Sequence, residues 1–436
     1  MVSPDLTHEV IDRYISAFHQ FCGEGTIVLG RDTRPSGFKL TSQILDHLIA
    51  YGRNVQDCGI CPTPTVQFVV SDTEAAGGIV VTASHNPSDW NGLKFINKDG
   101  CFLNQIEFNE FLSIMDSETG EGAEEVSKGT YSTFDHAVNR HIQRILAVEF
   151  LDIPSIKNYG FKVAVDAVNG AASKALPNLL EKLDCDVIEI NCFSDGDFSR
   201  GAEPLPSNLS ELCDTVKNKN CHLGLAVDPD GDRLAIVDEN GIPLGEEYTL
   251  VLAAELYMSS ISEKSKVVTN LSTTLALEKL AERYNFEVIR SPVGEINVVE
   301  KMKKVGADFG GEGNGGVILQ NVHLGRDSLV AAAMILDLMA KRKKPLSELF
   351  STMPQYFIVK DKISINGINP GNLLEQISEN YRGMEKNIED GLKLLWEDRW
   401  VHIRSSNTEP ILRIYAEAPT EGEAKSLVRD LREVMA

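Results

Sequence analysis

Three stretches of the chain share one arrangement, in which an apolar run ends in a short polar, glycine-rich loop and apolar residues then resume. They read IVVTASHNP, LAVDPDGDRLAIV and DFGGEGNGGVIL. Over the first 340 residues, strand-like apolar runs alternate with amphipathic segments, which is typical of α/β units with largely parallel sheets. The intervals between the stretches are unequal, so they are not tandem repeats. We therefore expect three related α/β domains, each presenting one loop at a shared cleft.

The last part of the chain, about eighty residues, has a different pattern. Long strand-like runs, YFIVKDKISI, KLLWEDRWVHIR and ILRIYAEA, precede a final amphipathic segment, GEAKSLVRDLREVM. This order predicts an α+β domain with hairpins. We expect four domains in all, over residues 1–147, 148–243, 244–355 and 356–436.

The charge balance argues against two classes of partner. The chain holds 42 Lys and Arg against 64 Asp and Glu, a net charge of −22, whereas nucleic acids and anionic membranes attract basic surfaces. The first residues lack the basic and apolar regions of a signal peptide, and the longest apolar stretch is too short to span a bilayer. We expect a cytoplasmic protein that acts on small molecules, and homo-oligomers stay open.

The sequence DPDGDR places Asp228, Asp230 and Asp232 at alternate positions. Three converging carboxylates repel one another unless a cation lies among them, which predicts a hard-metal site for Mg²⁺. An EF-hand is disfavoured because Arg233 stands where its loop needs glycine and strands flank the loop. A solvated acidic turn is the alternative, although the arginine suits an arriving phosphate.

Ser84, in the loop TASHNP, has three interpretations. A hydrolase nucleophile would need a G-x-S-x-G elbow, which is missing, and the side chains of the neighbours Ser84 and His85 should point apart on extended chain. An ordinary loop serine is the second interpretation. The third is a serine that carries a phosphoryl group beside the metal, with His85 and Lys94 nearby to handle charge and protons.

Two further loops carry groups that suit a sugar phosphate. RSSNTEPILRIY is a candidate phosphate site, with a surface turn as the alternative, and its polar members are Arg404, Ser406, Asn407, Thr408 and Arg413. In GEGNGG, Glu312 and Asn314 could accept from and donate to vicinal sugar hydroxyls. This loop matches neither a dinucleotide-binding fingerprint nor a P-loop.

Taken in order, TASHNP…NGLK, DPDGDR, GEGNGG and RSSNTEP resemble the motifs of the α-D-phosphohexomutase superfamily, one in each expected domain. GRDTRPSG and LGRDS resemble two further segments of that family. The resemblance implies three α/β domains with mixed sheets and a C-terminal α+β (TBP-like) domain around a central cleft. It covers nearly the whole chain.

The resemblance also implies roles for named residues. Ser84 becomes the phosphoserine, bound through its phosphate to an Mg²⁺ ion that the three aspartates hold. Arg31 and the loop around Arg404 become phosphate-binding groups, and Glu312 and Asn314 read the sugar. His85, Lys94 and Arg233 become catalytic candidates. The implied reaction interconverts hexose 1-phosphate and hexose 6-phosphate through a hexose 1,6-bisphosphate, which also activates the enzyme.

The family normally opens with a strand and loop resembling F-G-T-x-G-x-R-G, and this chain starts just after that point. We expect the first sheet to lack that strand and the nucleophile to lack that loop's arginine. DPDGDR and SNTEP favour a phosphomannomutase/phosphoglucomutase, with phosphoglucosamine mutase as the alternative. An aspartyl phosphatase using Asp228 and a non-catalytic sugar-phosphate sensor also stay open.

Overall fold

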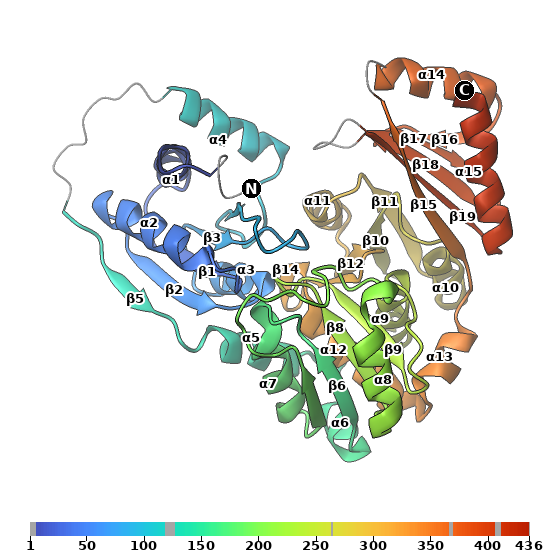
Figure 1. Cartoon of the computed structure of the whole chain (residues 1–436), viewed down its shortest axis with the longest axis horizontal. Coiled ribbons are helices and arrows are strands. Elements are labelled where there is room, and N and C mark those ends of the chain that lie inside the picture. The colour runs from blue at the N-terminus through green and yellow to red at the C-terminus, as the bar shows by residue number, and fades with distance from the viewer. Residues whose placement is uncertain (1–5, 118–126, 263–264, 366–368, 406–410, 436) are drawn as a thin grey trace.

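The computed structural model of the chain describes residues 6–117, 127–262, 265–365, 369–405 and 411–435. Four β-sheets follow one another along the chain, and the units built on them, which we number domains I to IV, are arranged in an arc (Figure 1). Three sheets combine parallel and antiparallel pairs and the fourth is antiparallel throughout. The expected fold class is confirmed.

Domain I holds a five-stranded sheet made of β1 (Ile27–Arg31), β2 (Val55–Ile60), β3 (Gly77–Val81), β4 (Leu93–Ile96) and β5 (Tyr131–Thr133). The strand order is β4-β3-β1-β2-β5. Strand β1 runs parallel to β2 and β3, and β4 returns antiparallel to β3. The described helices are α1 (His8–Phe21), α2 (Gly37–Ala50), α3 (Thr63–Asp72), α4 (Gln105–Ser117) and α5 (Ala137–Leu146).

Domain II holds a four-stranded sheet made of β6 (Lys162–Asp166), β7 (Asp186–Ile190), β8 (Leu223–Val227) and β9 (Leu234–Asp238). The order is β7-β6-β8-β9, with β6 parallel to β7 and β8 and with β9 antiparallel to β8. Its helical elements are α6 (Ile153–Tyr159), η1 (Ala171–Ser173), α7 (Ala175–Lys182), η2 (Pro206–Asn208) and α8 (Ser210–Lys219).

Domain III holds a five-stranded sheet made of β10 (Lys266–Asn270), β11 (Glu287–Ser291), β12 (Phe309–Glu312), β13 (Gly316–Leu319) and β14 (His323–Arg326). The order is β11-β10-β12-β13-β14, and β13 returns antiparallel to β12. Its helices are α9 (Glu247–Ser260), α10 (Ala276–Tyr284), α11 (Glu295–Val305), α12 (Ser328–Arg342) and α13 (Leu346–Thr352).

Domains I to III therefore share one strand plan, in which a first strand lies between two parallel neighbours and a fourth strand returns beside the third. Strands β3 and β8 are buried along their whole length, which is why they read as unbroken apolar runs. The three polar loops of the sequence all connect the third strand to the fourth, between β3 and β4, β8 and β9, and β12 and β13. The shared plan places all three loops at equivalent positions.

Domain IV holds an antiparallel sheet made of β15 (Phe357–Ser364), β16 (Glu385–Asn387), β17 (Leu392–Leu395), β18 (Trp400–Ser405) and β19 (Ile411–Ala418). Its helices α14 (Pro370–Asn380) and α15 (Glu421–Met435) pack on one face, where Ile403 and Ile414 are buried. Side chains alternate between faces along a strand, so polar neighbours of these residues point to the other face.

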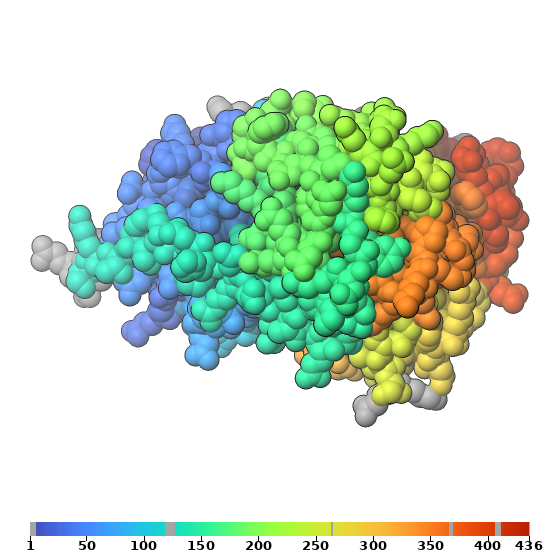
Figure 2. All heavy atoms as spheres, turned by 90° about the horizontal axis from the view of Figure 1, so that it is seen from below, coloured from blue at the N-terminus to red at the C-terminus, as the bar shows by residue number. Residues whose placement is uncertain are grey.

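The apolar cores divide the chain differently from the sheets. One continuous core joins domains II and III, because the buried helix α12 packs against both α6 and α9. Domains I and IV each have a core of their own. These two domains lie at opposite ends of the molecule, blue and red in Figure 2, with domains II and III between them.

The division points near residues 147, 243 and 355 stay a prediction, because the sheets alone do not fix them. Among the described residues, no helix combines the length and the apolar character that a membrane crossing requires.

Candidate functional site

The metal loop, residues 228–233, follows the end of β8 and is closed to solvent. Asp228, Asp230 and Asp232 are each 0% exposed, which rules out the solvated acidic turn. Gly231 has φ 70°, a left-handed conformation that favours glycine, and a Cβ there would meet Pro62 at 3.2 Å. The tight turn at Gly231 brings the three carboxylates together, with ligand oxygens within 4.8 Å of one another.

Each of these carboxylates has one oxygen bound by the protein and one oxygen left bare. Asp228 Oδ1 accepts from the backbone N–H groups of Asp232 and Arg233, both at 3.2 Å. Asp230 Oδ2 accepts from Thr63 Oγ1 at 2.7 Å, and Asp232 Oδ2 accepts from an Arg326 nitrogen at 2.6 Å. The remaining three oxygens, Asp228 Oδ2, Asp230 Oδ1 and Asp232 Oδ1, are buried without a hydrogen bond.

Buried carboxylate oxygens without a hydrogen bond are costly unless a cation lies beside them, and Arg233 Nε comes no nearer to Asp228 Oδ2 and Asp232 Oδ1 than 3.9 Å and 3.7 Å. Burial and the neighbouring Asp232 and Asp230 raise the pKa of Asp228 well above its usual range. Burial also acts on Asp230, but the ammonium of Lys94 and the hydroxyl of Thr63 hold the pKa of Asp230 well below its usual range. The donor set is all oxygen, as Mg²⁺ prefers, so these residues fit the predicted metal.

The serine loop, residues 82–90, follows β3 and is held by a residue that the sequence did not single out for this task. Arg34 is 1% exposed, and its guanidinium donates to backbone carbonyls of the loop, at 2.6 Å to Ser84, 2.8 Å to Asn86 and 3.0 Å to Trp90, and also to Pro87. Its Nε donates to Asp32 Oδ2 at 2.8 Å. One buried cation thus fixes the path of the loop through backbone groups.

The expected separation of the Ser84 and His85 side chains is wrong. Ser84 has φ 50°, so the chain is left-handed there and not extended, and the two side chains turn toward each other. Ser84 Oγ lies 3.4 Å from His85 Nδ1, which in turn lies 3.2 Å from an Arg233 nitrogen. Burial and Arg233 lower the pKa of His85, so Nδ1 is available as an acceptor at neutral pH.

Contacts of Lys94, on β4, and of Arg233 connect the surroundings of Ser84 to the metal loop. Lys94 lies 2.6 Å from Asp230 Oδ2 and 3.6 Å from Asp232 Oδ2. Although burial opposes it, these two carboxylates raise the pKa of Lys94, which keeps it protonated. Arg233 Nε lies 3.7 Å from Asp232 Oδ1. The contact between Ser84 and the aspartates therefore runs through His85 and Arg233.

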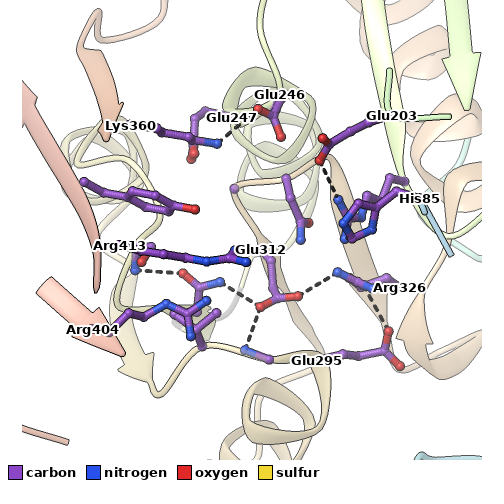
Figure 3. Close-up of a pocket in the computed structure, with 18 residues that line it drawn as sticks. His85, Glu203, Glu246, Glu247, Glu295, Glu312, Arg326, Lys360, Arg404 and Arg413 are labelled. Carbon is purple, nitrogen blue, oxygen red and sulfur yellow. Dashed lines mark hydrogen bonds and ion pairs between the residues drawn. The ribbon is translucent and has the colours of Figure 1, made fainter. Parts of the chain in front are cut away.

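A cavity of about 300 Å³ lies beside these loops and is lined by all four domains. His85 lies on one side of it, Arg404 and Arg413 lie on the other, and Glu312 lies between them (Figure 3). The volume is at the lower end of the range for small-molecule sites, about 300–1,000 Å³.

The sugar loop, residues 311–316, is tied to the metal loop by one guanidinium. Arg326, at the end of β14, donates to Glu312 Oε2 at 2.8 Å, to Glu295 Oε2 at 3.0 Å and to Asp232 Oδ2 at 2.6 Å. Glu312 Oε1 accepts from the Gly294 N–H at 2.9 Å. Asn314 lines the cavity, and its Oδ1 is buried without a partner.

Domain IV carries a row of three cations, of which Arg404 and Arg413 line the cavity. Arg404 on β18 pairs directly with Arg413 on β19, and Arg413 pairs with Lys362 on β15. Paired residues of antiparallel strands share a face, so the three positive side chains lie side by side, and Arg404 Nη1 lies 3.8 Å from Asp390 Oδ2. Arg404 Nε is buried without a hydrogen bond, and the arrangement suits a phosphate.

Of the residues expected at the site, those that line the cavity are His85, Arg233, Glu312, Asn314, Arg404 and Arg413. Ser84, Lys94 and the three aspartates do not line it and are linked to it by the contacts given above. Two groups of expected residues are exceptions. Ser406, Asn407 and Thr408 lie outside the described residues. Arg31 is not among the residues that line the cavity, and its guanidinium donates to the backbone carbonyl of Asp32. The roles given to the predicted residues stay predictions.

The contacts of Arg34 and Arg326 are not predicted from the sequence, although both arginines lie in quoted motifs. Asp32 in GRDTR binds the Arg34 guanidinium and is a local signal for it, whereas Asp327 in LGRDS contacts His141 and His323 and gives none for Arg326. Only the structure shows that one binds backbone carbonyls and the other three carboxylates.

Comparison with known proteins gives one family throughout. Profiles of the phosphoglucomutase/phosphomannomutase family match residues 1–121 and 139–241 (alpha/beta/alpha domains I and II), 245–356 (alpha/beta/alpha domain III) and 370–434 (C-terminal domain). The chain is 32% identical to a probable phosphoglucosamine mutase of Methanopyrus kandleri, covering 97% of this chain and 92% of that one.

Two further relatives agree. The chain is 34% identical to a phosphoglucomutase/phosphomannomutase of Thermococcus kodakarensis, covering 92% of this chain and 87% of that one. The crystal structure of a phosphoglucomutase/phosphomannomutase family protein from Burkholderia thailandensis superposes with a TM-score of 0.86 at 26% identity, covering 100% and 94% of the chains. The four matched domains, the relatives and the shared fold show that this chain belongs to the phosphoglucomutase/phosphomannomutase family.

Proposed function

We propose that the protein interconverts hexose 1-phosphates and hexose 6-phosphates, with Ser84 as the residue that carries the transferred phosphoryl group. The observation that carries this proposal is the cavity with a cationic group at each end. Arg233 contacts His85, which in turn contacts Ser84, and Figure 3 shows His85 on one side of the cavity with Arg404 and Arg413 on the other. A sugar with a phosphate at either end fits such a site, with one phosphate held at the arginine pair while the other position faces Ser84.

The reaction then has two matching halves. In the first, the free hydroxyl of the hexose phosphate bonds to the phosphorus of phosphoserine as the Oγ–P bond breaks, which leaves a hexose 1,6-bisphosphate. One proton leaves the sugar hydroxyl, and one is delivered to Ser84 Oγ. After the bisphosphate turns end for end, Ser84 attacks its other phosphate, and the isomeric monophosphate leaves. Both orientations use the same arginine pair.

Two neighbours of Ser84 and the metal loop are candidates for handling protons and charge, and their surroundings support different roles for them. His85 Nδ1 lies 3.4 Å from Ser84 Oγ and is uncharged, so it can receive the serine proton in one half and return it in the other. Lys94 stays charged and offsets negative charge on the phosphoryl oxygens. Asp228, Asp230 and Asp232 would hold Mg²⁺, which when bound supplies positive charge for the phosphoryl group.

Labelling of Ser84 tests the proposal. Purified protein is incubated with ³²P-labelled glucose 1,6-bisphosphate, and the label is located by peptide mass spectrometry. Turnover is followed in coupled assays with the 1-phosphates of glucose, mannose and glucosamine. We expect label on Ser84, loss of turnover in Ser84→Ala, and normal turnover in the matched control Ser88→Ala from the same loop.

Other results would contradict the proposal in distinguishable ways. Label on Asp228 would indicate an aspartyl phosphatase. Binding of sugar phosphates with no label and no turnover would indicate a sensor. Full activity in Ser84→Ala would exclude the serine as the carrier.

A further inference from the structure

Five glutamates line the cavity, and four of them have a basic partner. The pairs are Glu203 with Arg233 at 3.2 Å, Glu246 with Lys360 at 3.0 Å, and both Glu295 at 3.0 Å and Glu312 at 2.8 Å with Arg326. Glu247 is the fifth. Within the described ranges of the chain, no basic side chain lies within 4.0 Å of its carboxylate.

Glu247 is the first residue of helix α9, and its carboxylate is fixed in place. Its Oε2 accepts from the backbone N–H of Thr274 at 3.0 Å. The same carboxylate lies against Gly313, where a Cβ would stand only 1.9 Å from Oε2. Gly313 lies between Glu312 and Asn314 in the sugar loop, so Glu247 lies beside the residues expected to read the sugar ring.

Glu247 has a hydrogen bond from Thr274 and packs against Gly313, but among the described residues it has no basic partner. Burial raises the pKa of Glu247 to about 8, although Lys360 and the Thr274 N–H act in the opposite direction. A carboxylate in this position is largely protonated near neutral pH, and a cation brought beside it would restore its charge. Figure 3 shows Glu247 at the cavity wall, on the opposite side of the cavity from Glu295.

We propose that Glu247 binds the ammonium group of an amino sugar, which makes hexosamine phosphates the substrate class of this cavity. The inference rests on the proposed function, and it selects the amino-sugar alternative that the sequence left open. An ammonium offers donors to a carboxylate whose hydrogen bond from the Thr274 N–H leaves acceptor capacity, and such a bond is charge-assisted. A metal ion is a poorer occupant, because a single carboxylate beside a glycine does not make a coordination site.

The test compares two sugars that differ in the amino group. Specificity constants are measured for glucosamine 1-phosphate and glucose 1-phosphate with wild-type protein and with Glu247→Gln, which keeps the shape and the acceptor for Thr274 but removes the charge. We expect kcat/KM for glucosamine 1-phosphate to fall about tenfold or more, as for a lost bond to a charged group, while glucose 1-phosphate changes less than about twofold. Glu247→Asp should recover part of the loss.

Glu246→Gln is the matched control, because Glu246 is the neighbouring residue and already has Lys360 as its partner. It should affect both sugars alike. Binding of glucosamine 6-phosphate and glucose 6-phosphate, measured by calorimetry on wild type and Glu247→Gln, gives the same comparison without turnover.

Failure of the Glu247 proposal and failure of the proposed mutase function would give different results. Equal losses for both sugars in Glu247→Gln, or a wild-type protein that uses glucose and mannose phosphates but not glucosamine phosphates, would overturn this inference and leave the mutase function standing. An absence of label on Ser84 with every sugar would instead overturn the proposed function.

Discussion

The serine loop and the metal loop occupy the same place in two related sheets, yet they are built in different ways. The metal loop is buried and is fixed through side chains, with Asp230 bound by domain I and Asp232 bound by domain III. The serine loop is exposed from Asn86 to Trp90 and is fixed through its carbonyls by Arg34. The metal loop is held in place by burial between domains, whereas the serine loop is held by one buried cation, Arg34.

This difference suits the proposed chemistry. A metal ion that stays bound needs no path for substrate, so its loop can be sealed between domains. A phosphoserine must meet a sugar that enters, turns and leaves, so its loop has to stay open to the cavity. Arg34 fixes the backbone of this loop, and Ser84 is half-buried, unlike the enclosed aspartates of the metal loop.

The largest effect should come from Asp228→Asn. We expect turnover to fall by about a hundredfold to a thousandfold, since the cation that offsets phosphoryl charge would be lost. The fold should not suffer, because the substitution relieves repulsion among three buried carboxylates and keeps an acceptor for the Asp232 N–H. Calorimetry should show lost Mg²⁺ binding, with an unchanged or raised melting temperature for metal-free protein. A clear drop in that temperature would contradict the picture of a site built for a cation.

Arg34→Lys should lower turnover and stability while leaving Mg²⁺ binding intact, the reverse of what Asp228→Asn does to binding and stability. Lysine keeps the charge but loses the guanidinium fork that reaches several carbonyls at once. We expect turnover to fall by about tenfold to a hundredfold through misplacement of Ser84, with a loss of about 2–4 kcal/mol in the free energy of unfolding. Mg²⁺ affinity should stay as in wild type. An equal loss of Mg²⁺ affinity would mean that the two loops are not held independently.

Mg²⁺ should stabilise the wild-type protein by about 2.7 kcal/mol at a hundred times its dissociation constant. The effect should grow with pH, because the raised pKa of Asp228 means that a proton must leave before the ion binds. In metal-free protein the same group lowers stability as the pH rises above about 3.9, the ordinary Asp value, toward its raised pKa. Thermal melts with and without Mg²⁺ over a pH series measure both trends, and Asp228→Asn should flatten them.

The smallest effect should come from Asp89→Ala. Asp89 is exposed at the tip of the serine loop, and Arg34 holds the loop through carbonyls of other residues. Turnover should stay within about twofold and stability within about 0.5 kcal/mol. A large loss in either would show that side chains of the tip, and not only its backbone, hold Ser84 in place.

The sequence predicted the features that depend on local pattern. Alternating apolar runs gave the α/β domains, and the spacing of Asp228, Asp230 and Asp232 gave the metal loop. Arg34 was out of reach because its contacts are with backbone carbonyls, which any sequence would offer. The relation of Ser84 to His85 was wrong because a left-handed φ at a serine has no signature in residue type. Glu247 meets Gly313 only after α9 and the sugar loop pack together.

The row formed by Arg404, Arg413 and Lys362 has a practical consequence for work at the bench. Arginines at the cavity wall suit a tetrahedral anion, so sulfate or inorganic phosphate in a buffer should compete with the phosphate of the substrate. The apparent affinity for the sugar phosphate should therefore be lower in such buffers than in chloride. Domain IV should be more stable in them. The choice of counter-ion is therefore an experimental variable for this protein.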